Sequence, residues 1–78
     1  MKLLIVEDEK LLAESLKTLL EEKGFQVDAV YDGIAGEEYA ELDIYDLLIL
    51  DVLLPGQDGY QLARKLRARR CGTPILML

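Results

Sequence analysis

Two short runs of wholly apolar residues each end at carboxylates, and this pattern restricts the fold more than any other feature of the chain. The first run, residues 3–6, precedes the acidic residues 7–9, and the second run, residues 47–50, precedes Asp51. A short continuous apolar run fits a strand that is buried on both faces of a parallel sheet. The sequence therefore predicts two buried strands that deliver carboxylates at their ends.

The segment after the first run has apolar residues at helical spacing. It predicts a helix that starts at Asp8 or Glu9 and stops before Gly24, a residue suited to a helix C-terminus. The expected inward face consists of Leu12, Leu16, Leu19 and Leu20, with Leu11 beside it. Residues 25–30 then contain strand formers together with the polar Gln26 and Asp28, which favours a strand at the edge of the sheet.

The remaining segments continue the alternation of strand and helix. Residues 34–42 predict a second helix with Tyr39 and Leu42 on one face, weakened by roughly 1 kcal/mol at Gly36. A third helix is expected to be capped by Asp58 or Gly59 and to bury Leu62 and Leu66, with Ala63 beside them. Residues 75–78, from Ile75 to Leu78, predict a fourth buried strand. Such alternation indicates an α/β fold with a parallel sheet and right-handed crossovers.

Composition bounds the function. At 78 residues the chain is at most one domain, and its net charge of −6 argues against non-specific nucleic-acid binding. Residues 64–70 hold five of the nine cations, which is typical of a solvated helix face; a partner contact is the alternative. With Cys71 as the sole cysteine, no signal peptide and no apolar run of membrane length, we expect a cytoplasmic protein. The chain has no histidine to activate Cys71 as a nucleophile.

The carboxylates predict a metal site if the first strand lies between the second and the third. Glu7, Asp8 and Asp51 would then meet at the carboxyl edge of the sheet, where open α/β sheets bind ligands. Three converging carboxylates repel one another, and Mg²⁺, which prefers oxygen ligands, would offset that repulsion. A carboxylate beside such an ion can act as a nucleophile towards phosphorus. The alternative is that Asp8 or Glu9 simply caps the first helix.

Several segments resemble the response-regulator receiver domain. Residues 4–9 and 48–59 look like its two signatures, and residues 31–33 and 72–78 match the expected spacing. The pattern Asp-x-x-x-Pro-x-x-Asp-Gly, which begins at Asp51, is specific, whereas the acidic pair alone is weak. The resemblance covers the whole chain and is closest to the branch with a winged-helix DNA-binding domain. It implies a flavodoxin-like sheet of strand order 2-1-3-4, truncated before the fifth strand.

The resemblance also implies roles for individual residues. Asp51 would be the phosphoacceptor and would contact the metal, Asp8 a direct Mg²⁺ ligand, and Glu7 a ligand through water. The backbone carbonyl of Leu53 would complete the metal's protein ligands. Pro55 and Gly59 would shape the loop after the phosphorylation site. The implied partner is a sensor histidine kinase, and DNA would be contacted only through an output domain outside these residues.

The chain departs from the family pattern at its end. The chain lacks three features of the family: the Thr or Ser after the fourth strand, the lysine at the end of the fifth strand, and the surface that many relatives use to dimerise. We therefore expect it to correspond to the first two-thirds of a receiver. Residues 75–78 would then form an exposed apolar edge, which can recruit another copy or exchange elements with it.

Three other functions compete with the phosphoacceptor switch. A phosphatase or phosphotransferase with an aspartate nucleophile resembles Asp-x-Asp-x-Thr, whereas Leu53 stands two residues after Asp51. A pseudo-receiver or inactive fragment would act only as a protein-interaction module, and for residues 1–78 this alternative stays open. A flavodoxin-like cofactor binder lacks the phosphate loop that it would need after the first strand.

Overall fold

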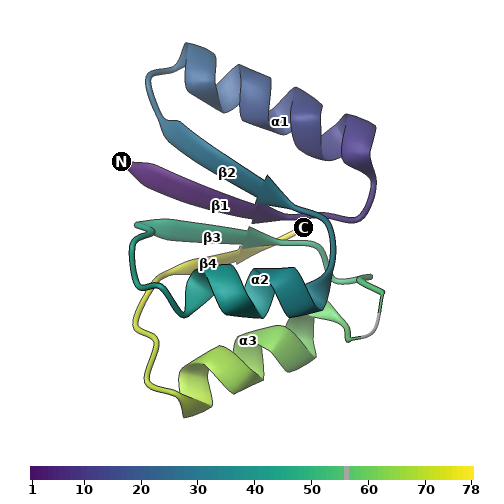
Figure 1. Ribbon diagram of the computed structural model, residues 1–78, viewed down its shortest axis with the longest axis vertical. Helices are drawn as coiled ribbons and strands as arrows, with labels where there is room; N and C mark the ends of the chain where they lie inside the picture. The colour runs from purple at the N-terminus through teal and green to yellow at the C-terminus, as the bar shows by residue number, and fades with distance from the viewer. Residues whose placement is uncertain (56) are drawn as a thin grey trace.

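Strands and helices alternate along the chain in the computed structural model, which describes residues 1–55 and 57–78 (Figure 1). The described elements are β1 (Lys2–Val6), α1 (Lys10–Glu22), β2 (Gln26–Val30), α2 (Gly33–Ala40), β3 (Leu47–Leu50), α3 (Gly59–Ala68) and β4 (Ile75–Met77). The predicted order of strands and helices is therefore confirmed. Gly56, which belongs to the predicted Pro-Gly turn, lies outside the described residues.

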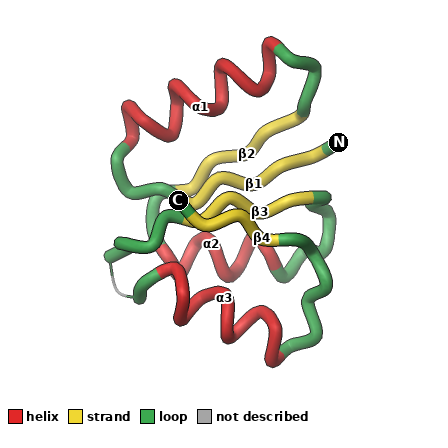
Figure 2. The backbone as a smooth tube through the Cα atoms, turned by 180° about the vertical axis from the view of Figure 1, so that it is seen from behind, coloured by secondary structure: helices red, strands yellow, loops and turns green. Residues whose placement is uncertain are grey.

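The four strands form one parallel sheet in the order β2-β1-β3-β4, as predicted. Helix α1 covers one face of the sheet, and α2 and α3 cover the other (Figures 1 and 2). Alternate residues of β1 serve the two faces: Leu3 and Ile5 pack on the α1 side, and Leu4 and Val6 on the opposite side. Helices on both faces explain why the strand contains no polar residue from Leu3 to Val6.

The inward face of α1 differs from the prediction. Leu12 and Leu19 are 41% and 53% exposed, whereas Leu16 and Leu20 pack against the sheet with the fully buried Ala13. The prediction is therefore confirmed for Leu16 and Leu20 and wrong for Leu12 and Leu19. The small Ala13 decides which face turns inward, because it allows the helix backbone to approach the sheet closely.

Helix α2 also turns a different face inward than predicted. Tyr39 and Leu42 are 40% and 59% exposed, and the helix ends at Ala40, before Leu42. Its buried residues are Gly33, Gly36 and Ala40. A methyl group on Gly36 would lie 2.8 and 2.9 Å from the two γ carbons of Val6 in β1. Gly36 is thus a close-packing position between helix and sheet.

Helix α3 follows the prediction at its start. Asp58 is the N-cap: its Oδ1 accepts a hydrogen bond from the Gln61 N–H (2.8 Å), and the Gln61 Oε1 accepts one from the Asp58 N–H (3.3 Å). This reciprocal pair is a capping box. Leu62 and Leu66 are fully buried, and Ala63 packs beside the same core.

The two edge strands of the described sheet are β2 and β4. In β4, Leu76 is 51% exposed, and Leu78, just beyond the strand, has the same exposure. The prediction of a buried fourth strand over residues 75–78 is therefore wrong: the strand ends at Met77, none of its residues is buried, and its apolar side chains reach solvent because it lies at the edge of the described sheet. Within the described residues, no helix combines the length and apolar character that a membrane crossing requires.

We predict that Gly36→Ala destabilises the chain by roughly 1–2 kcal/mol, although alanine favours a helix by about 1 kcal/mol over glycine. The reason is that Val6 is fully buried and has no room to move away from the added methyl group. Urea denaturation followed by circular dichroism measures the change. Gly72→Ala is the matched control, since a methyl group there meets no described atom within 4 Å. Equal stabilities of the two variants would contradict the packing argument.

Candidate metal centre

The pairing of β1 with β3 brings three carboxylates together. Val6 and Leu50 are partners in the parallel register, so Glu7 and Asp51 leave the sheet at the same edge. Carboxylate oxygens of Glu7, Asp8 and Asp51 all lie within 4.8 Å of one another. The structure therefore confirms the prediction that these three side chains lie close together.

Glu7 is the buried member of the cluster, with only 4% of its surface exposed. Its Oε2 accepts a hydrogen bond from the Glu9 N–H at 3.0 Å, and its own N–H donates to the Val30 carbonyl at 3.1 Å. Burial raises the pKa of Glu7, and the neighbouring Asp8 and Asp51 raise it further, against the lowering effect of the Glu9 N–H. The cluster thus disfavours a full set of negative charges.

Asp51 is held at the sheet edge by its backbone and by its side chain. Its N–H donates to the Val6 carbonyl at 2.9 Å, and its Oδ1 accepts from the Leu53 N–H at 3.2 Å. Asp51 is partly exposed and Asp8 is exposed, so the cluster opens to solvent on one side. A donor set of carboxylate oxygens that opens to water fits a hard divalent cation such as Mg²⁺.

The other residues assigned to the site lie in the connection from β3 to α3. Leu53 is beside Asp51 through its N–H, while its side chain is 77% exposed, and Pro55 is also exposed. Gly59 is buried at the start of α3, and its N–H donates to the Val52 carbonyl at 2.8 Å. A methyl group on Gly59 would overlap the Asp51 carbonyl oxygen, so only glycine lets α3 begin this close to the strand end.

The capping alternative for the first acidic cluster receives no support. Glu9 occupies the N-cap position of α1, but its side chain makes no capping hydrogen bond within the described part of the chain. The helix starts at Lys10, one or two residues later than predicted. Glu7 instead binds the Glu9 N–H, which keeps the acidic segment turned towards Asp51.

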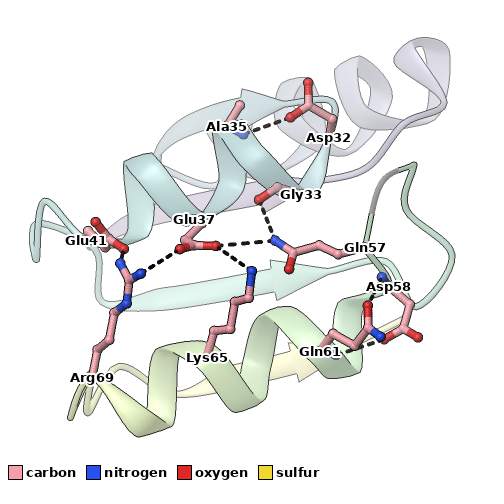
Figure 3. A network of polar contacts seen from close by, with 10 residues as sticks. All are labelled: Asp32, Gly33, Ala35, Glu37, Glu41, Gln57, Asp58, Gln61, Lys65 and Arg69. Atoms are coloured by element: carbon pink, nitrogen blue, oxygen red, sulfur yellow. Dashed lines mark hydrogen bonds and ion pairs between the residues drawn. The ribbon is translucent and has the colours of Figure 1, made fainter.

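One polar residue near the site was not singled out by the sequence pattern. Gln57 reaches from the β3–α3 connection to α2, where its Nε2 donates to the Gly33 carbonyl at 3.2 Å (Figure 3). The cations of residues 64–70 were expected on a solvated helix face. Lys65 and Arg69 are indeed more than half exposed, but both also pair with Glu37 of α2. The sequence could have predicted these ion pairs only if the faces of α2 and α3 that contact each other had been known.

Sequence comparison identifies the family. The profile of the response regulator receiver domain matches residues 3–78. Over all 78 residues the chain is 44% identical to the transcriptional regulatory protein DltR of Streptococcus agalactiae and 49% identical to the transcriptional regulatory protein CusR of Escherichia coli. It spans about a third of the length of these relatives, 35% and 34% respectively.

Solved structures agree with the sequence comparison. The receiver domain of the Francisella response regulator 1452 superposes with a TM-score of 0.94 at 30% identity, covering 97% of this chain and 63% of that one. The receiver domain of sensor histidine kinase PA1611 from Pseudomonas aeruginosa gives 0.91 at 35% identity, covering 97% and 64%. That structure has a magnesium ion coordinated in its active site cleft. The flavodoxin-like fold with strand order 2-1-3-4 is thus confirmed.

We predict that Glu7→Gln raises the melting temperature of the metal-free chain at pH 7 by on the order of 4 °C. The pKa of Glu7 is raised above its ordinary value of 4.5, so above that pH the folded chain holds its proton more tightly than the unfolded chain. The contribution of Glu7 to stability therefore falls as pH rises through that interval, and the glutamine variant escapes the loss.

Thermal unfolding between pH 4 and pH 8, without divalent cations, checks this expectation. The gain should vanish below about pH 4.5, where Glu7 is protonated in both states. Glu38→Gln, which neutralises an exposed acid, is the control for the change in net charge. An equal gain in the Glu38 variant, or a loss in the Glu7 variant, would show that burial at the cluster is not the cause.

Proposed function

The chain belongs to the response-regulator receiver family, and on that premise we propose that it accepts a phosphoryl group on Asp51 from a histidine kinase, with Mg²⁺ as its cation. The observation that supports this function best is the convergence of Glu7, Asp8 and Asp51 within 4.8 Å. A receiver is a phosphoacceptor module rather than a classical enzyme.

The proposed roles follow the exposure of each group. Asp8 and Asp51, which reach solvent, would bind the cation directly, and the buried Glu7 would act through a water molecule. The Leu53 carbonyl would supply a further ligand from the β3–α3 connection. The magnesium ion in the related PA1611 receiver domain supports this choice of metal.

In the proposed reaction, an Asp51 carboxylate oxygen forms a bond to phosphorus while the P–N bond to the donor's imidazole breaks. The imidazole nitrogen keeps the electron pair and takes up a proton. When bound, Mg²⁺ would offset negative charge on the transferring group. The Asp51 N–H donates to the Val6 carbonyl and its Oδ1 accepts from the Leu53 N–H, while the partly exposed side chain stays open to a donor that approaches from solvent.

The proposed output is transcription control through a segment outside these residues. DltR and CusR are named as transcriptional regulators, and the chain matches about a third of each. We therefore place the chain upstream of a DNA-binding domain in the cytoplasm, with a sensor histidine kinase as its partner.

A second copy of the chain is a further proposed partner, through residues 75–78 at the β4 edge. We predict that the 78-residue chain self-associates at high concentration and that Leu76→Lys abolishes this, because a charge on the edge opposes strand pairing. Leu19→Lys alters a similarly exposed leucine, 53% against 51%, on α1, which packs over β2 and β1, and should leave association unchanged. Sedimentation velocity measures both; a monomeric wild-type chain would overturn the proposal.

We predict that incubation with acetyl phosphate and Mg²⁺ adds one phosphoryl group to the full-length protein and that Asp51→Asn prevents this, because the amide is a poor nucleophile. Intact-mass spectrometry measures the addition. Asp43→Asn is the control, since Asp43 is an exposed acid with a positive φ of 56° that asparagine tolerates. No added mass on the wild type would favour the pseudo-receiver that acts only as an interaction module. Continuous hydrolysis of small phosphate esters would favour the enzyme.

A further inference from the structure

A polar bridge joins the β3–α3 connection to helix α2. The Gln57 Nε2 donates to the Gly33 carbonyl at 3.2 Å and lies 3.4 Å from Oε1 of Glu37 (Figure 3). Both acceptors belong to α2, whereas Gln57 belongs to the segment that follows Asp51. The bridge therefore fixes the far part of this segment to a helix that supplies no carboxylate to the cluster.

Packing and hydrogen bonding determine how the Gln57 side chain lies. Gly33 is buried, and a methyl group there would lie 2.6 Å from Cγ of Gln57, so the side chain fills the space that glycine leaves. Rotating the amide by half a turn would set its oxygen against a carbonyl and a carboxylate, which are both acceptors. In the observed orientation the buried Oε1 has no partner among the described residues. Gln57 thus forms the bridge at the cost of one unpaired acceptor.

Glu37, the charged acceptor of the bridge, is held from the side of α3. Its oxygens lie 3.5 Å from Nζ of Lys65 and 3.1 Å from Nη2 of Arg69, and only 17% of its side chain is exposed. Arg69 also pairs with Glu41, the C-cap residue of α2. The two cations are more than half exposed, so each pair is weak alone. Together they keep the Glu37 carboxylate facing the Gln57 amide.

The near part of the same segment is tied to the carboxylate cluster. The Leu53 N–H donates to Oδ1 of Asp51, and the Gly59 N–H donates to the Val52 carbonyl. The described residues of the connection, 51–55 and 57–58, are therefore anchored at one end by Asp51 and at the other by Gln57.

We propose that Gln57 is a positioning residue for the carboxylate cluster: by binding Gly33 and Glu37, it sets the β3–α3 connection and thereby the affinity of the site for a divalent cation. This inference rests on the proposed function of the site. The ion pairs of Lys65 and Arg69 with Glu37 then contribute to cation binding as well, because they orient the Glu37 carboxylate that accepts from Gln57.

The test compares Gln57→Met with Gln26→Met in the full chain. Methionine has nearly the shape of glutamine but cannot donate to Gly33 or Glu37, and Gln26 is exposed at the start of β2, at the opposite edge of the sheet. Amide hydrogen exchange at Leu53, relative to the core amide of Leu48, should rise about fivefold in the Gln57 variant, since one buried hydrogen bond contributes about 1 kcal/mol. Mg²⁺ affinity by calorimetry should fall by a similar factor.

A second variant tests the role of Glu37. Glu37→Met should also weaken Mg²⁺ binding, and the double variant should lose little more than Gln57→Met alone, because that variant already removes the Gln57–Glu37 contact. Additive losses would overturn the proposed dependence of Gln57 on Glu37.

Two results would overturn the positioning role itself. One is that Gln57→Met and Gln26→Met show the same exchange and the same affinity. The other is that exchange rises at Leu53 while Mg²⁺ affinity stays constant, since the bridge would then be purely structural. If the proposed function is wrong, the wild-type chain itself does not bind Mg²⁺. If only the positioning role of Gln57 is wrong, the wild type binds Mg²⁺ and Gln57→Met binds it equally well.

Discussion

The parallel pairing of β1 with β3 is the interaction on which the rest of the structure depends. Burial of both strands by helices on both faces fixes their register, with Val6 beside Leu50. The residue that follows each of these positions is an acid, and the Asp51 N–H closes the ladder on the Val6 carbonyl. The apolar strands thus place charges side by side that would separate in the unfolded chain.

The consequence is an edge of the sheet with unbalanced negative charge. Glu7 is buried there, and burial together with Asp8 and Asp51 raises its pKa. Repulsion among the three carboxylates disfavours their full ionisation, and a bound cation would reduce this repulsion. On the α2–α3 side, acids and cations instead neutralise each other: Glu37 lies between Lys65 and Arg69. Gln57 joins α2 to the connection that follows Asp51, and the proposed positioning role rests on this contact.

The strands and the carboxylates at their ends could be predicted from short apolar runs, whereas the strand order that brings the carboxylates together was implied by the resemblance to the receiver domain. The inward faces of α1 and α2 could not, because small residues decide them. Ala13 and Gly36 permit close approach to the sheet, while larger leucines nearby stay exposed, and apolar periodicity gives small residues little weight. The Gln57 bridge was missed for a different reason: it depends on a contact between a connection and a helix some twenty residues earlier, which no local pattern encodes.

The central claim is that paired strands create one divalent-cation site at the edge of the sheet. Mn²⁺ can replace Mg²⁺ at oxygen sites and broadens the NMR signals of nearby amides. A titration with substoichiometric Mn²⁺ should broaden first the amides of residues 7–9 and 51–53, and excess Mg²⁺ should restore them. Broadening spread over the exposed acids of α1 and α2, with no preference for these two segments, would contradict the claim.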